Sequence, residues 1–178
     1  MKPRHVGISK ILFDEDESDR GCVIFCAAFI EEHLETLLRS CLRKDRDAAK
    51  VVESLFNVYA PFSTLSAKIQ VNYALGLIPD KLHKQLLMVK KLRNDFAHDD
   101  AAVSFESPKY KPQIEALRES FRGGSEDIDT KYLPKIKHLG KRLVNRFAFC
   151  MCMSEIAERL EVAEKFATMR VYALTRKG

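Results

Sequence analysis

The residues best suited to chemistry in this 178-residue chain are Arg93 and His98, which stand five positions apart in the run RNDFAH at 93–98. Arginine carries a permanent charge and can hold a phosphate group through two hydrogen bonds. Histidine can exchange a proton near neutral pH. Together the two could hold a scissile RNA phosphate and assist attack by its 2′-hydroxyl. One hypothesis is therefore an RNA-cleaving site.

A simpler hypothesis gives the same two residues a structural role. Five residues on an unbroken helix correspond to a rotation of about 140°, so the two side chains would diverge. They converge only if the helix ends between them or a second copy of the chain completes the site. In the structural alternative His98 caps the end of its helix, while Arg93 pairs with a nearby carboxylate such as Asp95 or Asp99.

A second candidate is a basic stripe near the C-terminal end of the sequence, made of Lys135, His138, Arg142 and Arg146. Offsets of three, seven and eleven residues fall within about 60° on a helix, beside an apolar stripe. Such a row could contact nucleic-acid phosphates, and the net charge of +5 permits this without demanding it. A solvated helix face is the alternative. With no helix-turn-helix and no zinc-finger spacing, a sequence-reading DNA-binding module is not predicted.

The five cysteines are expected to be small core residues. Cys22 and Cys26 could place two thiols on one helical face, but Cys150 and Cys152 would point about 200° apart. The sequence contains no Cys-x-x-Cys, no His-Glu-x-x-His and no phosphate-binding loop, so no metal and no cofactor is predicted. An odd cysteine count without a secretory leader or a membrane-length apolar run predicts a cytoplasmic protein that does not enter membranes.

The run 93–98 closes a predicted helix over residues 79–98. Pro79 and the carboxylate of Asp80 are suited to its start. Apolar residues then recur at helical spacing and predict a buried face. They are Leu82, Leu86, Val89, Leu92 and Phe96.

The remaining chain predicts more helices and few strands, because Gly and Pro are scarce (7 and 6) and apolar residues recur at helical spacing. A long helix is expected from Ser18 or Asp19 to 43–44. Shorter ones follow, and a last long helix begins at Pro134. The predicted ranges of the shorter ones are 45–56, 63–77 and 114–121. The fold class is all-α, a single-domain helical bundle with long first and last helices. Residues 1–17 are expected to be a polar segment, and 18–178 the helical domain with a mobile loop near 122–131.

Four blocks of sequence, in order, resemble the mannitol operon repressor (MltR-like) family. They are LRKD at 42–45, PFSTLSAKI at 61–69, YALGLI at 73–78 and LRNDFAH at 92–98. The matching region spans about 20–105. The resemblance implies an all-helical regulator of transcription that lacks a standard DNA-binding motif. It also implies action through a protein partner or self-association, and it supplies no catalytic residues.

The run 93–98 also resembles the Arg-x4-His motif of HEPN-domain ribonucleases, in which a polar residue follows the arginine, here Asn94. That likeness implies a metal-independent RNA endonuclease, a toxin or defence component, with Arg93 and His98 catalytic and Asn94 in support. The preferred hypothesis is the transcriptional regulator without catalytic activity, and the endoribonuclease is the alternative.

Overall fold

A computed structural model of the chain describes residues 8, 17–99, 103–122 and 141–175. Within these residues the chain forms six helices and no strand, which confirms the predicted all-α class. The helices are α2 (Asp19–Cys41), α3 (Arg46–Ser54), α4 (Leu65–Ala74), α5 (Asp80–His98), α6 (Lys111–Glu119) and α8 (Lys141–Thr175). The predicted polar segment at 1–17, the predicted mobile loop near 122–131 and the start at Pro134 fall almost entirely outside the described residues.

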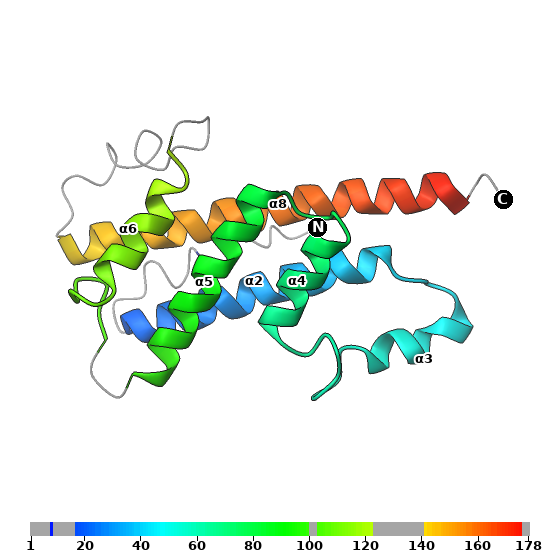
Figure 1. Cartoon of the computed structure of the whole chain (residues 1–178), viewed down its shortest axis with the longest axis horizontal. Coiled ribbons are helices and arrows are strands. Elements are labelled where there is room, and N and C mark those ends of the chain that lie inside the picture. The colour runs from blue at the N-terminus through cyan, green and yellow to red at the C-terminus, as the bar shows by residue number, and fades with distance from the viewer. Residues whose placement is uncertain (1–7, 9–16, 100–102, 123–140, 176–178) are drawn as a thin grey trace.

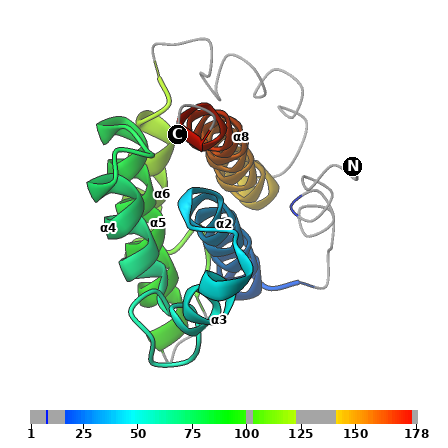
Figure 2. The same cartoon turned by 90° about the vertical axis from the view of Figure 1, so that its right-hand side faces the viewer.

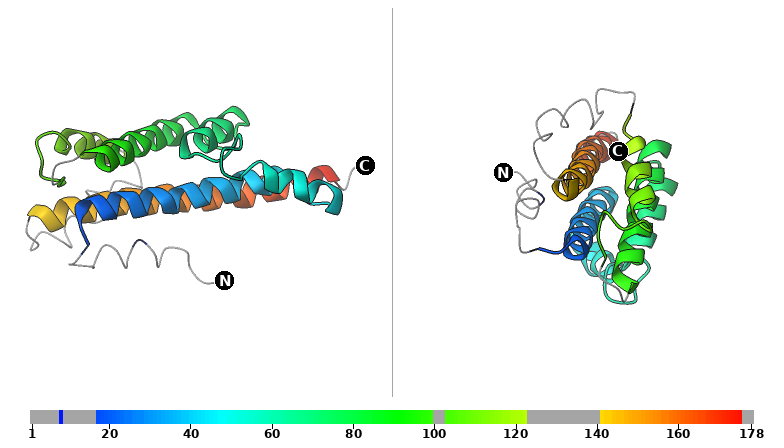
Figure 3. Two further views of the ribbon diagram at one scale, coloured as in Figure 1. Left: turned by 90° about the horizontal axis from the view of Figure 1, so that it is seen from below. Right: turned by 90° about the vertical axis from the view of Figure 1, so that its left-hand side faces the viewer.

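The helices form two layers (Figures 1 and 2). The two longest are α2 with 23 residues and α8 with 35, in agreement with the predicted long first and last helices. They lie side by side and run in the same direction. Helices α4, α5 and α6 cross over this pair and form the second layer (Figure 3). The short α3 lies at the end of the molecule toward which α8 runs.

Three helices begin at a side-chain cap, which satisfies backbone amides that have no partner inside the helix. Ser18 accepts from the Gly21 amide (2.9 Å), Asp45 from Ala48 (3.0 Å) and Thr64 from Ala67 (3.1 Å). The cap of α4 is therefore one residue later than the predicted Ser63. At α5 the predicted carboxylate cap is wrong: Pro79 is the cap residue without a side-chain bond, and Asp80 accepts from the Tyr73 hydroxyl (2.9 Å).

Helix α4 ends at Ala74, shortly before the stop predicted at Gly76–Pro79. The φ of Gly76, +67°, lies in the left-handed region that glycine adopts without strain. The Gly76 amide donates to the Tyr73 carbonyl and the Leu77 amide to the Asn72 carbonyl, both at 2.9 Å. This pair of bonds closes the last turn of α4 and lets the chain reverse into α5.

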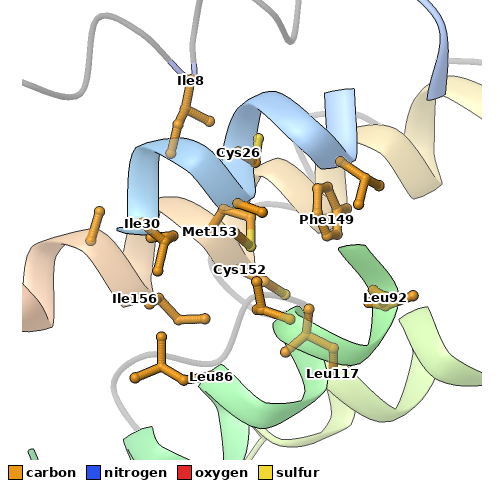
Figure 4. Packing of buried hydrophobic residues seen from close by; sticks show 14 of the residues in the cluster. Ile8, Cys26, Ile30, Leu86, Leu92, Leu117, Phe149, Cys152, Met153 and Ile156 are labelled. Atoms are coloured by element: carbon orange, nitrogen blue, oxygen red, sulfur yellow. The ribbon is translucent and has the colours of Figure 1, made fainter. Parts of the chain in front are cut away.

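The predicted apolar face of α5 is confirmed, because all five of its residues are buried. Figure 4 shows that this face packs into a single core. Side chains from α2, α5, α6 and α8 meet there, among them Ile30, Leu86, Leu117 and Ile156. At the far end of α5, the ring of Phe96 packs between Phe105 and Tyr110. Burial of this stripe holds the second layer on the long pair of helices.

Polar side chains also join the layers. Lys68 on α4 is 6% exposed, and its ammonium forms ion pairs with Glu31 (2.9 Å) and Glu35 (3.0 Å) on α2. Partial burial works to raise the pKa of Glu35, but hydrogen bonds from Lys68 and Arg39 outweigh it and lower this pKa below its ordinary value. One turn along α4, the buried amide of Asn72 donates to the Leu34 carbonyl (3.1 Å). These bonds fix the position of α4 on α2.

Helix α3 differs from the other described helices because none of its residues is buried. The sequence places apolar residues at helical spacing in 48–56, and that spacing predicts a packed face. Val51 is instead 63% exposed. Apolar spacing predicts a face but not the partner that would cover it, and α3 lies at the edge of the bundle, where it has none of the core around it.

Candidate functional site

Arg93 and His98 both lie on α5, which continues without a break from Asp80 to His98. The helix does not end between them, so the rotation of about 140° turns the two side chains to different faces. Arg93 is half-buried and donates from Nη1 to Oδ1 of Asn94 (3.1 Å), whereas His98 is exposed. Within one chain the pair does not share a face. A catalytic role for Arg93, Asn94 and His98 stays a prediction that needs a second copy of the chain.

The residue after α5, Asp99, is tied to the rest of the fold. Its Oδ2 accepts from Lys109 Nζ (2.8 Å) and from the Tyr110 hydroxyl, and its carbonyl accepts from Nη2 of Arg20 (2.5 Å). The bond to Asp99 raises the pKa of the Lys109 ammonium well above its ordinary value. Burial first, and then the same carboxylate, raises the pKa of the Tyr110 phenol. Contacts from α2 and from the segment before α6 therefore anchor this end of α5.

The carboxylates that the structural alternative assigned to Arg93 are bonded to other residues. Asp95 Oδ2 accepts from Nε2 of Gln113 (3.0 Å) and lies 4.0 Å from Nζ of Lys91. Asp99 accepts from Lys109, Tyr110 and Arg20, and Arg93 donates to Asn94. The predicted partner of Arg93 is therefore wrong. The carboxylates of Asp95 and Asp99 nevertheless have a structural role, because their bonds join α5 to neighbouring segments.

The basic stripe is only partly within the described residues. Lys135 and His138 lie outside them, and Arg142 lies in the first turn of α8. Arg146 is 3% exposed and donates from Nη1 to the carbonyl of Glu17 (2.8 Å). The prediction that Arg146 faces solvent or a nucleic acid is wrong, because α8 packs along α2 and this turn of α8 faces the start of α2.

Three of the cysteines meet in the core, which the sequence did not predict. Sγ of Cys22 lies 3.6 Å from Sγ of Cys150, and the sulfurs of Cys22, Cys26 and Cys150 are all within 4.8 Å of one another. The prediction that these residues are buried is confirmed, since all three are 0% exposed. The i, i+4 spacing of Cys22 and Cys26 was the visible signal. The third thiol depends on how α8 is placed along α2, which no local pattern encodes.

The three thiols change one another's acidity. Hydrogen bonds from Cys150 and Cys26 lower the pKa of Cys22 to about 4, and the charge of Arg146 acts in the same direction. Hydrogen bonding to Cys150 and Cys22 raises the pKa of Cys26, and hydrogen bonding to Cys22 raises that of Cys150. Cys22 is therefore the thiol of the three whose pKa its neighbours and the charge of Arg146 lower, whereas the pKa values of Cys26 and Cys150 are raised.

Helix α3 and the second half of α8 lie at the same end of the molecule (Figures 1 and 3), and both regions carry exposed large apolar side chains. Val162, Phe166 and Met169 stand four and three residues apart and so share one face of α8. Tyr59, in the connection after α3, is 99% exposed and has a φ of +67°, which is strained for a residue other than glycine. We call these two groups together the exposed apolar end, although α2 lies between α3 and α8 when the molecule is viewed end-on (Figure 2). It comprises Val51, Val58, Tyr59, Val162, Phe166 and Met169, each at least 45% exposed.

The helices thus define an all-α bundle with an anchored α5, a buried thiol cluster and an exposed apolar end. The sequence model of the family described as mannitol repressor matches residues 11–132, well over half of the chain, and contains the region of 20–105 on which the resemblance rests. The chain therefore belongs to the mannitol repressor family, MtlR. No curated protein matches the chain in sequence.

A solved structure supports the fold. The chain is similar to one in the X-ray structure of the MtlR–HPr complex from Escherichia coli, with a TM-score of 0.66 and 19% sequence identity. The match covers 87% of this chain and 98% of that one. Across the described residues, no helix combines the length and the apolar character that spanning a membrane would require.

Proposed function

We propose that this protein is a repressor-type transcriptional regulator that acts by binding a protein partner, HPr or a relative of it, and not by reading DNA with a standard motif. Membership of the mannitol repressor family carries this proposal. The partner is suggested by the similar MtlR chain, whose structure was solved with HPr. The lack of a helix-turn-helix or zinc-finger spacing in the sequence agrees with action through a partner.

The surface that suits a partner best is the exposed apolar end. Aromatic residues and methionine are enriched at protein interfaces, and Tyr59 (99% exposed), Phe166 (68%) and Met169 (65%) are of these types. Val162, Phe166 and Met169 share one face of α8, and such a group of exposed apolar side chains is typical of an interaction surface, whereas single ones are ordinary. The end of α5 is a weaker candidate, because its polar groups are bonded within the fold.

Binding to purified HPr encoded in the same genome, measured by calorimetry, tests the partner. We expect binding by the native chain and a loss of at least tenfold in affinity for Phe166→Asp, because a charge would have to be desolvated in an apolar contact. Thr168→Asp is the matched control: it adds the same charge on another exposed face of α8 and should change affinity less than about twofold. Equal losses in both variants would exclude this surface.

Transcription of the mannitol operon tests the regulatory role. Deleting the gene for this chain should raise reporter expression in the absence of mannitol. The native chain should restore repression, and Phe166→Asp should restore it less well than Thr168→Asp. Unchanged reporter expression after deletion, together with no binding to HPr, would contradict the proposal.

A further inference from the structure

The buried thiol cluster joins the two longest helices and takes no part in the proposed regulation. Cys22 and Cys26 stand one turn apart on α2, and Cys150 reaches them from α8. A metal site needs at least three Cys, His, Asp or Glu side chains whose ligand atoms lie close together. Among the described residues these three cysteines meet that condition, with all sulfurs within 4.8 Å of one another. Thiolates are the protein ligands that soft metal ions prefer.

We propose that Cys22, Cys26 and Cys150 form a binding site for one thiophilic d10 metal ion, Zn(II) or Cu(I), held between α2 and α8. A metal–sulfur bond of about 2.3 Å places sulfurs on one ion about 3.8–4.0 Å apart. The Cys22–Cys150 separation of 3.6 Å is already close to this value, and the third sulfur is within 4.8 Å of both. Small side-chain rotations are therefore enough to close the site around an ion.

The charges around the cluster suit bound thiolates. A buried negative charge is costly unless a positive group is near. Arg146 is 3% exposed, and its charge acts on both Cys22 and Cys150, while Asp19 acts on Cys22 in the opposite direction. Cys22 also lies in the first turns of α2, where the helix dipole favours an anion. Arg146 therefore places a positive charge in the core where it would offset the negative charge of bound thiolates.

The number of ligands distinguishes the two ions. Three thiolates can complete a trigonal site for Cu(I), whereas protein-bound Zn(II) normally takes four ligands. The cluster supplies three from the described residues. Retention of Cu(I) alone would indicate the three-thiolate site, and retention of Zn(II) would indicate that a fourth ligand joins. Both results support a metal site at these cysteines.

Metal retention by the reduced full-length chain tests the proposal. The protein is incubated without oxygen with Zn(II) alone or Cu(I) alone and desalted, and the bound metal is counted by mass spectrometry. We expect about one ion per chain in at least one arm. Metal at 100 times its Kd should raise the melting temperature by about 5–10 °C, since the ion binds the folded state. Less than about 0.1 ion per chain in both arms would overturn the proposal.

Cysteine variants locate the ion. Cys150→Ala should lose the stoichiometric metal, whereas Cys152→Ala, a matched control that is 1% exposed on the same helix but outside the cluster, should keep it. Equal loss in both would overturn the proposal. Alkylation of the native chain avoids the risk that Cys150→Ala fails to fold. Metal should slow modification of Cys22, Cys26 and Cys150 about tenfold and leave Cys41 unchanged, and unchanged rates at all four would also overturn the proposal.

Discussion

At the scale of single residues, Arg146 shows how a side chain acquires a role that its sequence position does not predict. Its spacing from Arg142 indicates a solvent-facing basic stripe, yet it is buried and bonded to the Glu17 carbonyl. Arginine tolerates this because its guanidinium can donate several hydrogen bonds and stays charged. The charge then acts on the thiols of Cys22 and Cys150, so one buried residue links the start of α2 to the cluster.

Tyr110 is one of the residues that hold the end of α5. Its hydroxyl donates to Asp99 and lies 3.3 Å from the Asp95 carbonyl, and the side chain is 1% exposed. Tyr110→Phe keeps the ring but removes the hydroxyl that donates to Asp99 and leaves this carboxylate with the bond from Lys109, so we expect a loss of about 1–2 kcal/mol in the free energy of unfolding. Urea denaturation of the native chain and of Tyr110→Phe measures this difference in the free energy of unfolding. His98→Ala, on an exposed residue of the same segment, should change stability by less than about 0.5 kcal/mol, and an equal loss there would contradict this assignment.

The divergence of Arg93 and His98 on α5 leads to a prediction about activity. We expect purified protein to leave RNA intact in the presence of a chelator, because the cation and the proton-transfer group do not share a face within one chain. Gel analysis of labelled RNA measures this. Cleavage by the native chain that disappears in His98→Ala would contradict the prediction and restore the endoribonuclease hypothesis, with a second copy completing the site.

At the scale of helices, local signals in the sequence predicted more than tertiary placement. The span of α5 and its buried stripe follow from the spacing of apolar residues, and the end of α4 follows from the left-handed turn at Gly76. These signals are encoded within a few residues. The exposure of α3 and the meeting of Cys150 with Cys22 depend on which helices pack together. That choice is made by the whole core, so the sequence pattern predicted neither the exposed helix nor the third thiol.

The ion pairs of Lys68 give a prediction about α4. Lys68→Met removes a buried cation from between Glu31 and Glu35, which are only partly exposed, so we expect a loss of about 1–2 kcal/mol in the free energy of unfolding. Lys84→Met, the same change at an exposed position of α5, is the control and should have little effect on urea denaturation. Equal losses in the two variants would contradict this prediction, because they would show that the ion pairs of Lys68 with Glu31 and Glu35 contribute no more than any other lysine charge.

The lowered pKa of Glu35 adds a dependence on pH. A carboxylate with a lower pKa in the folded state contributes stability above its unfolded pKa of about 4.5, and this stability is lost as pH falls through the folded value. The native chain should therefore lose stability below about pH 4.5, measured as the urea midpoint at successive pH values. In Lys68→Met this decrease should be smaller, because the main hydrogen bond that lowers the pKa is gone. An identical pH dependence in both proteins would contradict the assignment.

At the scale of the whole molecule, the contacts that anchor α5 and the proposed recognition surface lie at different ends. The α5–α6 side is held by the Asp99 contacts and by the aromatic packing around Phe96, and the thiol cluster lies near the start of α2. The other end carries the exposed apolar side chains and α3, which contributes no buried residue. A surface that is only weakly tied to the core can adjust to a partner without weakening the fold. This separation favours the α3 end as the docking surface.

Hydrogen exchange tests this division across the whole chain. Amides of α3 and its flanking connections should exchange fastest among the described helices, because few buried contacts protect them, and amides in the middle of α2, α5 and α8 should exchange slowest. Adding HPr should slow exchange around Tyr59 and around Phe166 together, since both belong to the exposed apolar end. Thr168→Asp should show the same protection, and Phe166→Asp should not. Protection confined to 93–98 would instead place the partner at the end of α5, and the anchored segment would then be the recognition surface.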